Sequence, residues 1–414
     1  MSINTKEFKT ACKRVKGFIS NKPRLPILHR VLMTSDGSRL VMTGYNMEVG
    51  IGARIGIACD SEPFATTIAF QDMEKIVAKL KADSLEIVPI TKPDVRANGD
   101  VSETVEYIDV SIKSGPLSFT LNGRDAADYP VLPSPINPAD GSDLLAITSA
   151  PFATFASELS FVMMATCLDT PKNFTSGVLF NYRADCVHLV GTDGKRLHRA
   201  FLPGESVATK PEPIPYLERK PACVDSDNYS AILSSLSLAS LIKLPGIADT
   251  DTIEIHMHEN LMTWSIPACD LSGVTHLLDT PYPDYEKVIP DLSNVFELES
   301  KPTLQAIDSL SVIAHERDGR DMVVVNANGR LNLSVKAESM GSANADLPIT
   351  HIASGIGNNG DDCRFALNIG YLADVMKADT SGTLTMSNAG ALEPARFDYQ
   401  DGRIAIIMPV RLPE

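Results

Sequence analysis

The chain has 414 residues, 37 of them Lys or Arg and 52 Asp or Glu, so its formal charge is −15. This length predicts two or three domains, and a hydrophobic content of 44% is enough to build their cores, which excludes disorder for most of the chain. The acidic total argues against indiscriminate coating of nucleic acid but permits a local basic surface. Seven scattered cysteines, an N-terminus without an apolar leader and the lack of a membrane-span pattern predict a cytoplasmic protein.

The first predicted element is an amphipathic helix over Thr5–Ser20. Its apolar residues recur at intervals of three and four, and so do four lysines, which places the two sets on nearly opposite sides. A solvated face is the ordinary interpretation of such a stripe, but its presence in an acidic chain favours a surface that contacts duplex phosphates. The candidate DNA-binding residues are Lys6, Lys9, Lys13 and Lys16, the nearby Lys22 and Arg24, and Lys75 and Lys79 of a second predicted helix.

Three segments resemble one another, and each predicts a β-hairpin. They begin at Val31, Val178 and Val323, about one third of the chain apart. In each repeat one predicted helix precedes the hairpin, and a second helix followed by an alternating strand comes later. The helices are predicted over Thr5–Ser20, Phe70–Lys81, Ala150–Ala165, Tyr229–Lys243, Lys301–His315 and Ile369–Lys377. This pattern predicts an α+β fold of three repeated domains, each with two helices packed on antiparallel sheets.

Turn residues cluster at two similar junctions, Ala127–Pro138 and Tyr282–Asp291. They predict domains over residues 1–140, 141–292 and 293–414. Two further segments, Pro211–Pro221 and Gly341–Asp362, are rich in proline or glycine and predict surface loops.

Two patterns are weak indications of small-ligand sites, and neither is assigned. Gly355–Gly360 has GxGxxG spacing, but neither a strand–turn–helix setting nor a downstream ribose acid supports it. His256 and His258 share one face of a predicted strand, but no third metal ligand is near in sequence. Because the common catalytic signatures are also missing from the sequence, we expect no catalysis, no metal and no cofactor. An enzyme that uses a cleft between repeats is the alternative.

Short motifs along the whole chain resemble the bacterial DNA polymerase III beta subunit, the replicative sliding clamp. They are Pro23–Leu28, Leu40–Gly44, Ala126–Pro130, Thr192–Leu197, Tyr282–Val288, Asn368–Tyr371 and Ile406–Leu412. The resemblance implies that two chains close head to tail into a six-domain ring whose helices line a hole for duplex DNA. It implies a non-catalytic processivity factor whose partners are double-stranded DNA of any sequence, the polymerase III alpha subunit, the clamp loader and other proteins with a clamp-binding motif. A clamp-like scaffold that recruits partners without encircling DNA is the alternative function.

The resemblance also implies a hydrophobic cleft for partner peptides between the second and third domains. Its wall, carried over position by position, is Thr175, Thr192, Gly194, Lys195, Arg196, Leu197, Pro283, Lys287, Val288, Asn368, Tyr371, Ile406, Ile407, Met408, Pro409, Val410, Arg411 and Leu412. Thr175 and Lys287 depart from the aliphatic residue and the arginine usual in the family, which leaves the peptide preference open. The implied subunit contact pairs Phe119 and Leu121 of one chain with Val312 and Ile313 of the other, and core packing is the alternative for these four.

Overall fold

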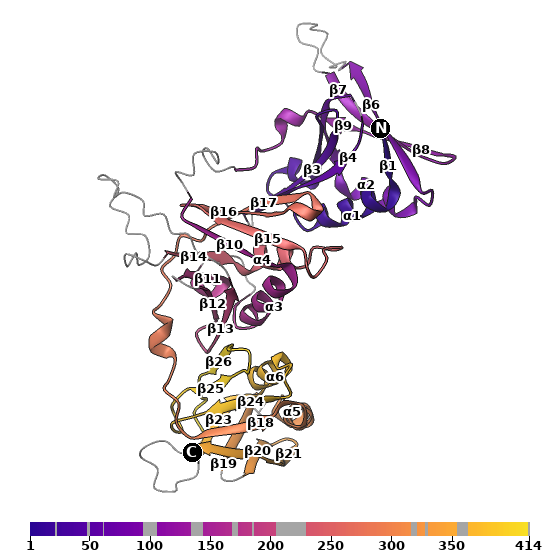
Figure 1. The fold of residues 1–414 in the computed structure, drawn as a ribbon. Helices are drawn as coiled ribbons and strands as arrows, with labels where there is room; N and C mark the ends of the chain where they lie inside the picture. Colours follow the sequence, from indigo (N-terminus) through magenta and orange to yellow (C-terminus); the bar gives the residue numbers. More distant parts are fainter. Residues whose placement is uncertain are drawn as a thin grey trace, which may run out of the picture. The chain divides into compact units, whose positions relative to one another are not determined.

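The computed structural model, drawn in Figure 1, describes most of the chain. Its contacts divide the chain into two compact units. The described residues are 1–20, 23–47, 50–60, 62–93, 106–133, 144–167, 173–183, 186–203, 229–315, 321–327, 330–353 and 363–412. Unit 1 comprises Met1–Ala156, Tyr182–Cys186 and Pro203–Leu278, and unit 2 comprises Ser157–Asn181, Val187–Leu202 and Asp279–Glu414.

Six α-helices lie within the described residues, each inside or within one residue of a predicted helix. They are α1 (Thr5–Lys16), α2 (Phe70–Lys79), α3 (Phe152–Met163), α4 (Ser235–Ile242), α5 (Ser300–Ala314) and α6 (Ile369–Ala378). The prediction was wrong for Tyr229–Ser234, which forms strand β14 before α4 begins. Its last four residues are buried in succession, and such a continuous apolar run cannot be told from a buried helix by periodicity.

Unit 1 contains a four-stranded and a nine-stranded antiparallel sheet. The first has the order β1 (Ser2–Asn4), β6 (Ser84–Pro93), β7 (Glu106–Ser114), β8 (Leu117–Leu121). The second has the order β10 (Ala146–Pro151), β15 (Thr252–Met257), β16 (Leu261–Ile266), β17 (Leu271–His276), β4 (Ile51–Ala58), β3 (Arg39–Asn46), β2 (Arg30–Ser35), β5 (Phe64–Ala69), β9 (Gly123–Arg124).

Unit 2 contains strands paired in the same antiparallel manner. The larger set has the order β11 (Gly177–Tyr182), β12 (Cys186–Thr192), β13 (Arg196–Pro203), β26 (Ile404–Ile407), β25 (Ala395–Asp398), β24 (Thr383–Ser387), β18 (Val295–Glu299), β22 (Thr350–Ala353). The smaller has the order β21 (Gly341–Pro348), β20 (Arg330–Ala337), β19 (Met322–Ala327), β23 (Cys363–Asn368).

The order of elements repeats three times among the described residues: a strand, a helix, four strands, a helix and three strands, with β9 and β22 as additions. The predicted α+β class is therefore confirmed. The three hairpins predicted from Val31, Val178 and Val323 correspond to β2–β3, β11–β12 and β19–β20. The predicted domain boundaries remain predictions, because the compact units divide the middle repeat between them.

The loop prediction for Gly341–Asp362 was wrong over its first part. Residues Gly341–Pro348 form β21, which pairs with β20 along its whole length, and β22 pairs with β18. The small alternating side chains of β21 carry little hydrophobic signal, so only the pairing with β20 reveals a strand. Residues 354–362, which include the GxGxxG segment, and the loop predicted over Pro211–Pro221 lie outside the described residues.

The N-terminal helix packs its apolar side onto the nine-stranded sheet of unit 1. Phe8 and Val15 are fully buried, and Phe18 just beyond the helix stacks on Trp264 with ring centroids 5.9 Å apart. A Cβ atom on Gly44 of β3 would lie 2.9 Å from Val15 Cγ2, so glycine is what lets this helix approach the sheet closely. In the described part of the chain, no helix has both the length and the apolar character needed to cross a membrane.

Candidate functional site

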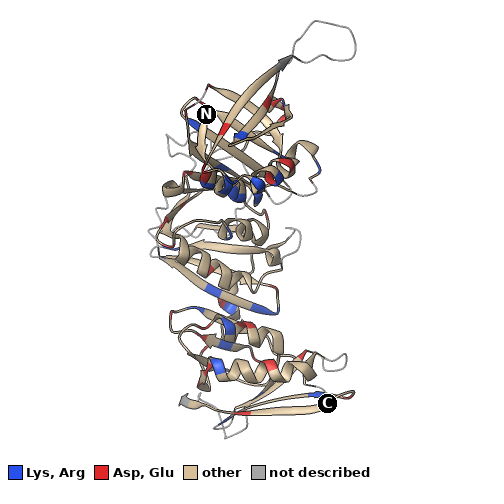
Figure 2. Cartoon of the chain, turned by 90° about the vertical axis from the view of Figure 1, so that its right-hand side faces the viewer, with Lys and Arg blue, Asp and Glu red and all other residues tan. Residues whose placement is uncertain are grey.

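The lysines of α1 lie on the side of the helix that faces away from the core. Asn4 caps the helix, its Oδ1 accepting hydrogen bonds from the amides of residues 6 and 7, and the buried side is formed by Thr5, Phe8, Ala11, Cys12 and Val15. Lys6, Lys13 and Lys16 are exposed and Lys9 is half-buried. Figure 2 shows Lys and Arg residues gathered on helices near the N-terminus, where α1 and α2 lie. The amphipathic pattern of the sequence thus produces a basic helix face.

Two of these four lysines already have partners. The Nζ atom of Lys9 donates to the Leu80 carbonyl at 2.7 Å, and that of Lys16 lies 2.7 Å from Glu74 Oε1. Among the described residues, the ammonium groups of Lys6 and Lys13 form no ion pair or hydrogen bond. An exposed ion pair contributes only about 0–1 kcal/mol, so a phosphate could replace Glu74 as the partner of Lys16.

The remaining predicted basic residues fall into three groups. On α2, Lys75 lies 3.6 Å from Asp72, whereas the ammonium group of Lys79 has no partner in the described structure. Arg24 is exposed. Lys22 lies outside the described residues.

The predicted DNA-binding residues omit two basic residues, Arg14 on α1 and Lys243 at the end of α4. Arg14 donates to the carbonyls of Pro245 and Gly246 at 3.0 and 2.8 Å, which ties α1 to the loop after α4. Lys243 at the end of α4 is exposed and, with Lys13 and Arg14, lines a hollow of about 280 Å³ between the two helices. Lys243 ends a predicted helix, which was the available signal, whereas the role of Arg14 depends on a loop far away in sequence.

The candidate peptide cleft lies within unit 2 and begins at the turn between β12 and β13. Asp193 Oδ1 accepts hydrogen bonds from the amides of Lys195 and Arg196 at 2.8 and 3.0 Å, and Thr192 Oγ1 donates to the Arg196 carbonyl at 2.6 Å. Gly194 has a φ of 84°, a conformation that favours glycine. The Thr-Asp-Gly motif therefore builds a rigid turn.

Arg196 is held by groups of the protein itself. Its Nε lies 3.1 Å from Asp193 Oδ2, its Nη1 lies 2.7 Å from Asp374 Oδ2 on α6, and its guanidinium lies 4.1 Å from the centre of the Tyr371 ring. Burial, and then the negative charge of Asp193, raise the pKa of the Tyr371 hydroxyl. Asn368 caps α6 by accepting the Tyr371 amide at 3.0 Å. Because two carboxylates already compensate Arg196, it is a positioning residue here more than an open charge for a partner.

The apolar wall predicted for the cleft divides into an accessible and a buried part. Met408 is 40% exposed and Val288 39%, and Pro409 and Val410 are half-buried. In contrast, Leu197 is 4% exposed and Ile406 and Ile407 are fully buried. These three support the surface from below, because β13 and β26 pair directly there.

Backbone bonds hold the C-terminal segment against the rest of this wall. The Met408 amide donates to the Lys195 carbonyl at 2.9 Å and the Val410 amide to the Ala366 carbonyl at 2.8 Å. Arg411 is exposed and Leu412 is half-buried.

The segment Pro283–Val288 is fastened beside the cleft by two tyrosines. Tyr285 is buried, with its hydroxyl 3.1 Å from both Asn181 Nδ2 and His188 Nδ1, and Tyr282 donates to the Val190 carbonyl at 3.1 Å. Pro283 is exposed.

Thr175 and Lys287, which depart from the family pattern, both have local partners. Thr175 donates to Asn173 Oδ1 at 2.7 Å. Lys287 lies 2.9 Å from Asp284, whose carboxylate raises the pKa of the lysine.

The four predicted subunit-contact residues lie on two surface elements. Phe119 and Leu121 lie on β8, an edge strand, with Phe119 half-buried and Leu121 buried. Val312, which is 59% exposed, and the half-buried Ile313 lie on α5, which packs against β20 and the edge strand β21.

His256 and His258 have different surroundings. His258 is buried, with Nε2 3.2 Å from Thr263 Oγ1, and His256 is half-buried on β15. Over the described ranges, no cluster of three or more His, Cys, Asp or Glu is arranged to hold a metal ion.

Comparison with known proteins defines the class. Superposition on a DNA polymerase sliding clamp from Pseudomonas aeruginosa, solved with a ligand, has a TM-score of 0.80 at 17% identity and covers 100% of this chain and 99% of that one. The DNA polymerase III beta subunit from Thermotoga maritima has a TM-score of 0.78 at 18% identity, with the same coverage. The fold is that of the DNA polymerase sliding clamps.

Sequence comparison finds relatives of the same class. Residues 1–133 match the family described as DNA polymerase III beta subunit, N-terminal domain. The chain is 22% identical over 422 residues to the beta sliding clamp of Haemophilus influenzae, covering 99% of both, and 23% identical over 421 residues to that of Synechococcus elongatus, covering 98% of this chain and 97% of that one. The resemblance to the beta sliding clamp predicted from the sequence is thus confirmed along nearly the whole chain.

Proposed function

We propose that this protein is a DNA sliding clamp, a ring-shaped homodimer that encircles duplex DNA and tethers a replicative polymerase and other partners to it. The observation that supports this proposal most strongly is the basic face of α1, in a chain whose fold matches sliding clamps from end to end. The protein performs no chemistry of its own in this proposal. Its task is to keep partners at the DNA.

The DNA contact is electrostatic and independent of sequence. Lysine ammonium groups meet phosphates as point charges and read no base edges, so the ring slides. Lys6, Lys13 and Lys79 supply charges that no described residue compensates, while Lys9 and Lys16 exchange their present partners for phosphate. The acidic total of the chain keeps the remaining surface from coating nucleic acid.

Ring closure needs two surfaces that complement each other head to tail. We assign one to β8 with Phe119 and Leu121, and the other to α5 and β21 with Val312 and Ile313. Both sheets present an open edge strand there, and an unpaired edge favours addition of another strand.

Partner peptides dock on the cleft of unit 2. An aliphatic or aromatic side chain of the partner packs on Met408, Val288 and Pro409, while Arg196 and Tyr371 hold one another in place at its side. The polymerase III alpha subunit and the clamp loader are the partners we assign to this surface.

Encirclement is tested by comparing circular and linear DNA. Protein loaded onto nicked circular plasmid by its clamp loader should co-elute with the plasmid in gel filtration and leave it when the plasmid is linearised. Equal loss from circular and linear DNA would contradict the ring. A hole wide enough for duplex DNA should be visible in electron micrographs of the dimer.

A scaffold that recruits partners without encircling DNA is the second candidate, because Lys9 and Lys16 already have protein partners. The double variant Lys6→Glu/Lys13→Glu separates the two. If the clamp proposal is right, this variant should lose both retention on circular DNA and the DNA-dependent stimulation of the polymerase. If the scaffold proposal is right, that stimulation should be unchanged.

A further inference from the structure

The nine-stranded sheet of unit 1 repeats the strand pairing that underlies the peptide cleft of unit 2. In unit 1, β17 pairs with β4 so that Val274 faces Gly52. In unit 2, β26 pairs with β13 so that Ile406 faces Leu197. The next strands, β16 and β25, continue the same register, with Thr263 opposite Val274 and Arg396 opposite Ile406. Val274 is therefore the structural counterpart of Ile406 in the cleft.

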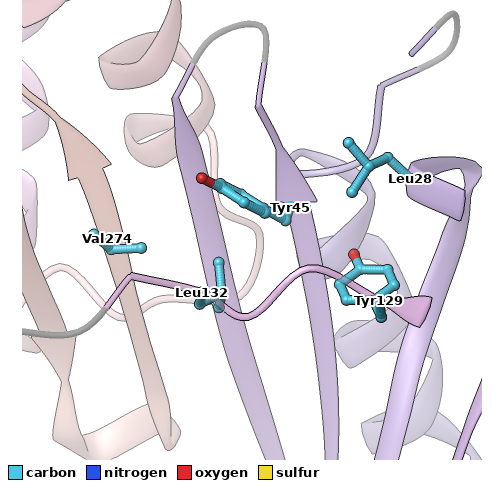
Figure 3. Packing of buried hydrophobic residues seen from close by; sticks show 5 residues of the cluster. All are labelled: Leu28, Tyr45, Tyr129, Leu132 and Val274. Carbon is cyan, nitrogen blue, oxygen red and sulfur yellow. The ribbon is translucent and has the colours of Figure 1, made fainter. Parts of the chain in front are cut away.

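The segments that cross these sheets also correspond. Leu132 follows Tyr129 by three residues, as Val288 follows Tyr285, and both tyrosines are buried. Leu132 is 4% exposed, whereas Val288 is 39% exposed. Leu132 packs in a cluster with Tyr129, Val274, Leu28 and Tyr45, shown in Figure 3. The first junction thus has the elements that form one wall of the candidate cleft at the second.

A hollow of about 300 Å³ lies beside Leu132 and Val274. Pro133 adds to its apolar part, and Thr263, Ser265 and Ser272 line it with short side chains. Its volume is at the lower end of the range of ligand pockets.

Side-chain size explains why the hollow is open in unit 1. The counterparts of Thr263 and Ser265 in unit 2 are Arg396 and Asp398. Those two form an ion pair at 2.7 Å, and Arg396 also donates to the Pro290 carbonyl at 3.0 Å. Two hydroxyl side chains replace this ion pair in unit 1.

The charges around the hollow are separated. Arg54 lines one side, and its guanidinium forms no ion pair or hydrogen bond within the described residues. Glu254 lies three strands away on β15, about 14 Å at the usual strand spacing, so it does not compensate Arg54. An occupant with a carboxylate near Arg54 would complement this arrangement.

We propose that this hollow is a second docking site for a linear peptide of a protein partner. The peptide inserts an aliphatic side chain beside Leu132 and Val274 and places a carboxylate on Arg54. The choice of a peptide as occupant rests on the proposed function of the unit 2 cleft, whose counterpart this is. A clamp with two such sites per chain would hold one partner at two points or two partners together.

The test uses isothermal titration calorimetry of the full-length protein with acetyl-Ser-Leu-Leu-Glu-Ser-amide. The variant Met408→Glu blocks the unit 2 cleft, so binding that remains reports on the hollow. We expect this variant still to bind one peptide per chain. Adding Arg54→Glu to Met408→Glu should weaken the remaining peptide binding at least tenfold. A peptide with Lys in place of Glu should bind this double variant with the original affinity. Adding Thr263→Arg/Ser265→Asp, which copies the ion pair of unit 2, should abolish the remaining peptide binding.

The outcomes distinguish this proposal from the proposed function. If wild type binds one peptide and Met408→Glu binds none, the unit 2 cleft stands and the second site is wrong. If wild type and Met408→Glu bind the same number of peptides per chain and Arg54→Glu weakens that binding, the second site stands and the cleft assignment is wrong. Binding to Met408→Glu that neither added change reduces would overturn the location. N-acetyl-leucine amide binding as tightly as the pentapeptide would overturn the peptide as occupant.

Discussion

The buried imidazole of His198 should make unit 2 sensitive to mild acid. His198 lies on β13, is fully buried, and its ring stacks on Phe161 with centroids 4.7 Å apart. Its Nδ1 lies 2.8 Å from the Phe161 carbonyl, so Nδ1 carries the proton, and the buried Nε2 has no hydrogen-bond partner among the described residues. Protonation would place a second N–H where no described group accepts it, and a positive charge in a buried site.

The size of the effect follows from the pKa. Burial, with a smaller contribution from Arg196, lowers the pKa of His198 from 6.5 to about 4. The folded state then binds fewer protons than the unfolded state below pH 6.5, so stability is lost as the pH falls from 6.5 towards 4. At 1.36 kcal/mol per pKa unit, the complete loss is about 3 kcal/mol, of which about 2 kcal/mol is lost by pH 5.

Urea unfolding followed by circular dichroism at pH 7.5 and pH 5 measures this loss, with His198→Gln as the comparison. Other titrating groups are common to both proteins, so the difference between their pH dependences isolates His198. Wild type should lose about 2 kcal/mol more than the variant over this interval. Equal pH dependence of the two proteins would refute the reasoning.

The basic face of α1, the Arg14 contacts and the exposed Met408 can each be tested by substitution. Lys6→Glu/Lys13→Glu should make the slope of log affinity for duplex DNA against log salt concentration shallower by about two, at about 0.9 per lost phosphate contact, whereas Lys336→Glu on β20 should leave the slope unchanged. Filter binding over a salt series measures the slope, and an unchanged slope in the double variant would show that α1 does not contact DNA. Arg14→Ala should destabilise unit 1 by about 1–3 kcal/mol, because two hydrogen bonds to the loop after α4 are lost. Thermal unfolding followed by fluorescence of the single tryptophan measures this loss of stability, and an unaltered midpoint would show that these bonds are dispensable. Met408→Ala should weaken binding of a polymerase-derived peptide by about tenfold or more, while the dimer remains intact in analytical ultracentrifugation. Unchanged affinity would show that the peptide does not bind at Met408.

Local patterns in the sequence were sufficient for most of the secondary structure. The spacing of apolar residues in α1 and α2 and the alternation in the three hairpins depend only on neighbours along the chain, so they are visible without a structure. The threefold recurrence strengthened each of these assignments. Tyr229–Ser234 and Gly341–Pro348 were missed because one is a buried strand without alternation and the other gains its order from pairing with β20.

The same distinction between local pattern and long-range contact applies to the candidate site. That α1 has a basic face follows from the sequence, because helix geometry alone sets which side chains share a side. That Lys9 and Lys16 already have partners, and that Arg14 ties down a distant loop, depends on residues from other parts of the chain. No local pattern specifies such long-range contacts.

At the candidate peptide cleft, the sequence by itself determined which motifs belong together, through their resemblance to the beta sliding clamp. Only the tertiary structure decided that Ile406 and Ile407 are buried supports, that Met408 is the accessible side chain, and that Asp374 compensates Arg196. Burial and ion pairing are properties of the packed chain, since they depend on which strands and helices come to lie beside one another. For the same reason the hollow beside Leu132 depends on the tertiary structure, because its lining comes from β4, β15, β16, β17 and the segment after Tyr129.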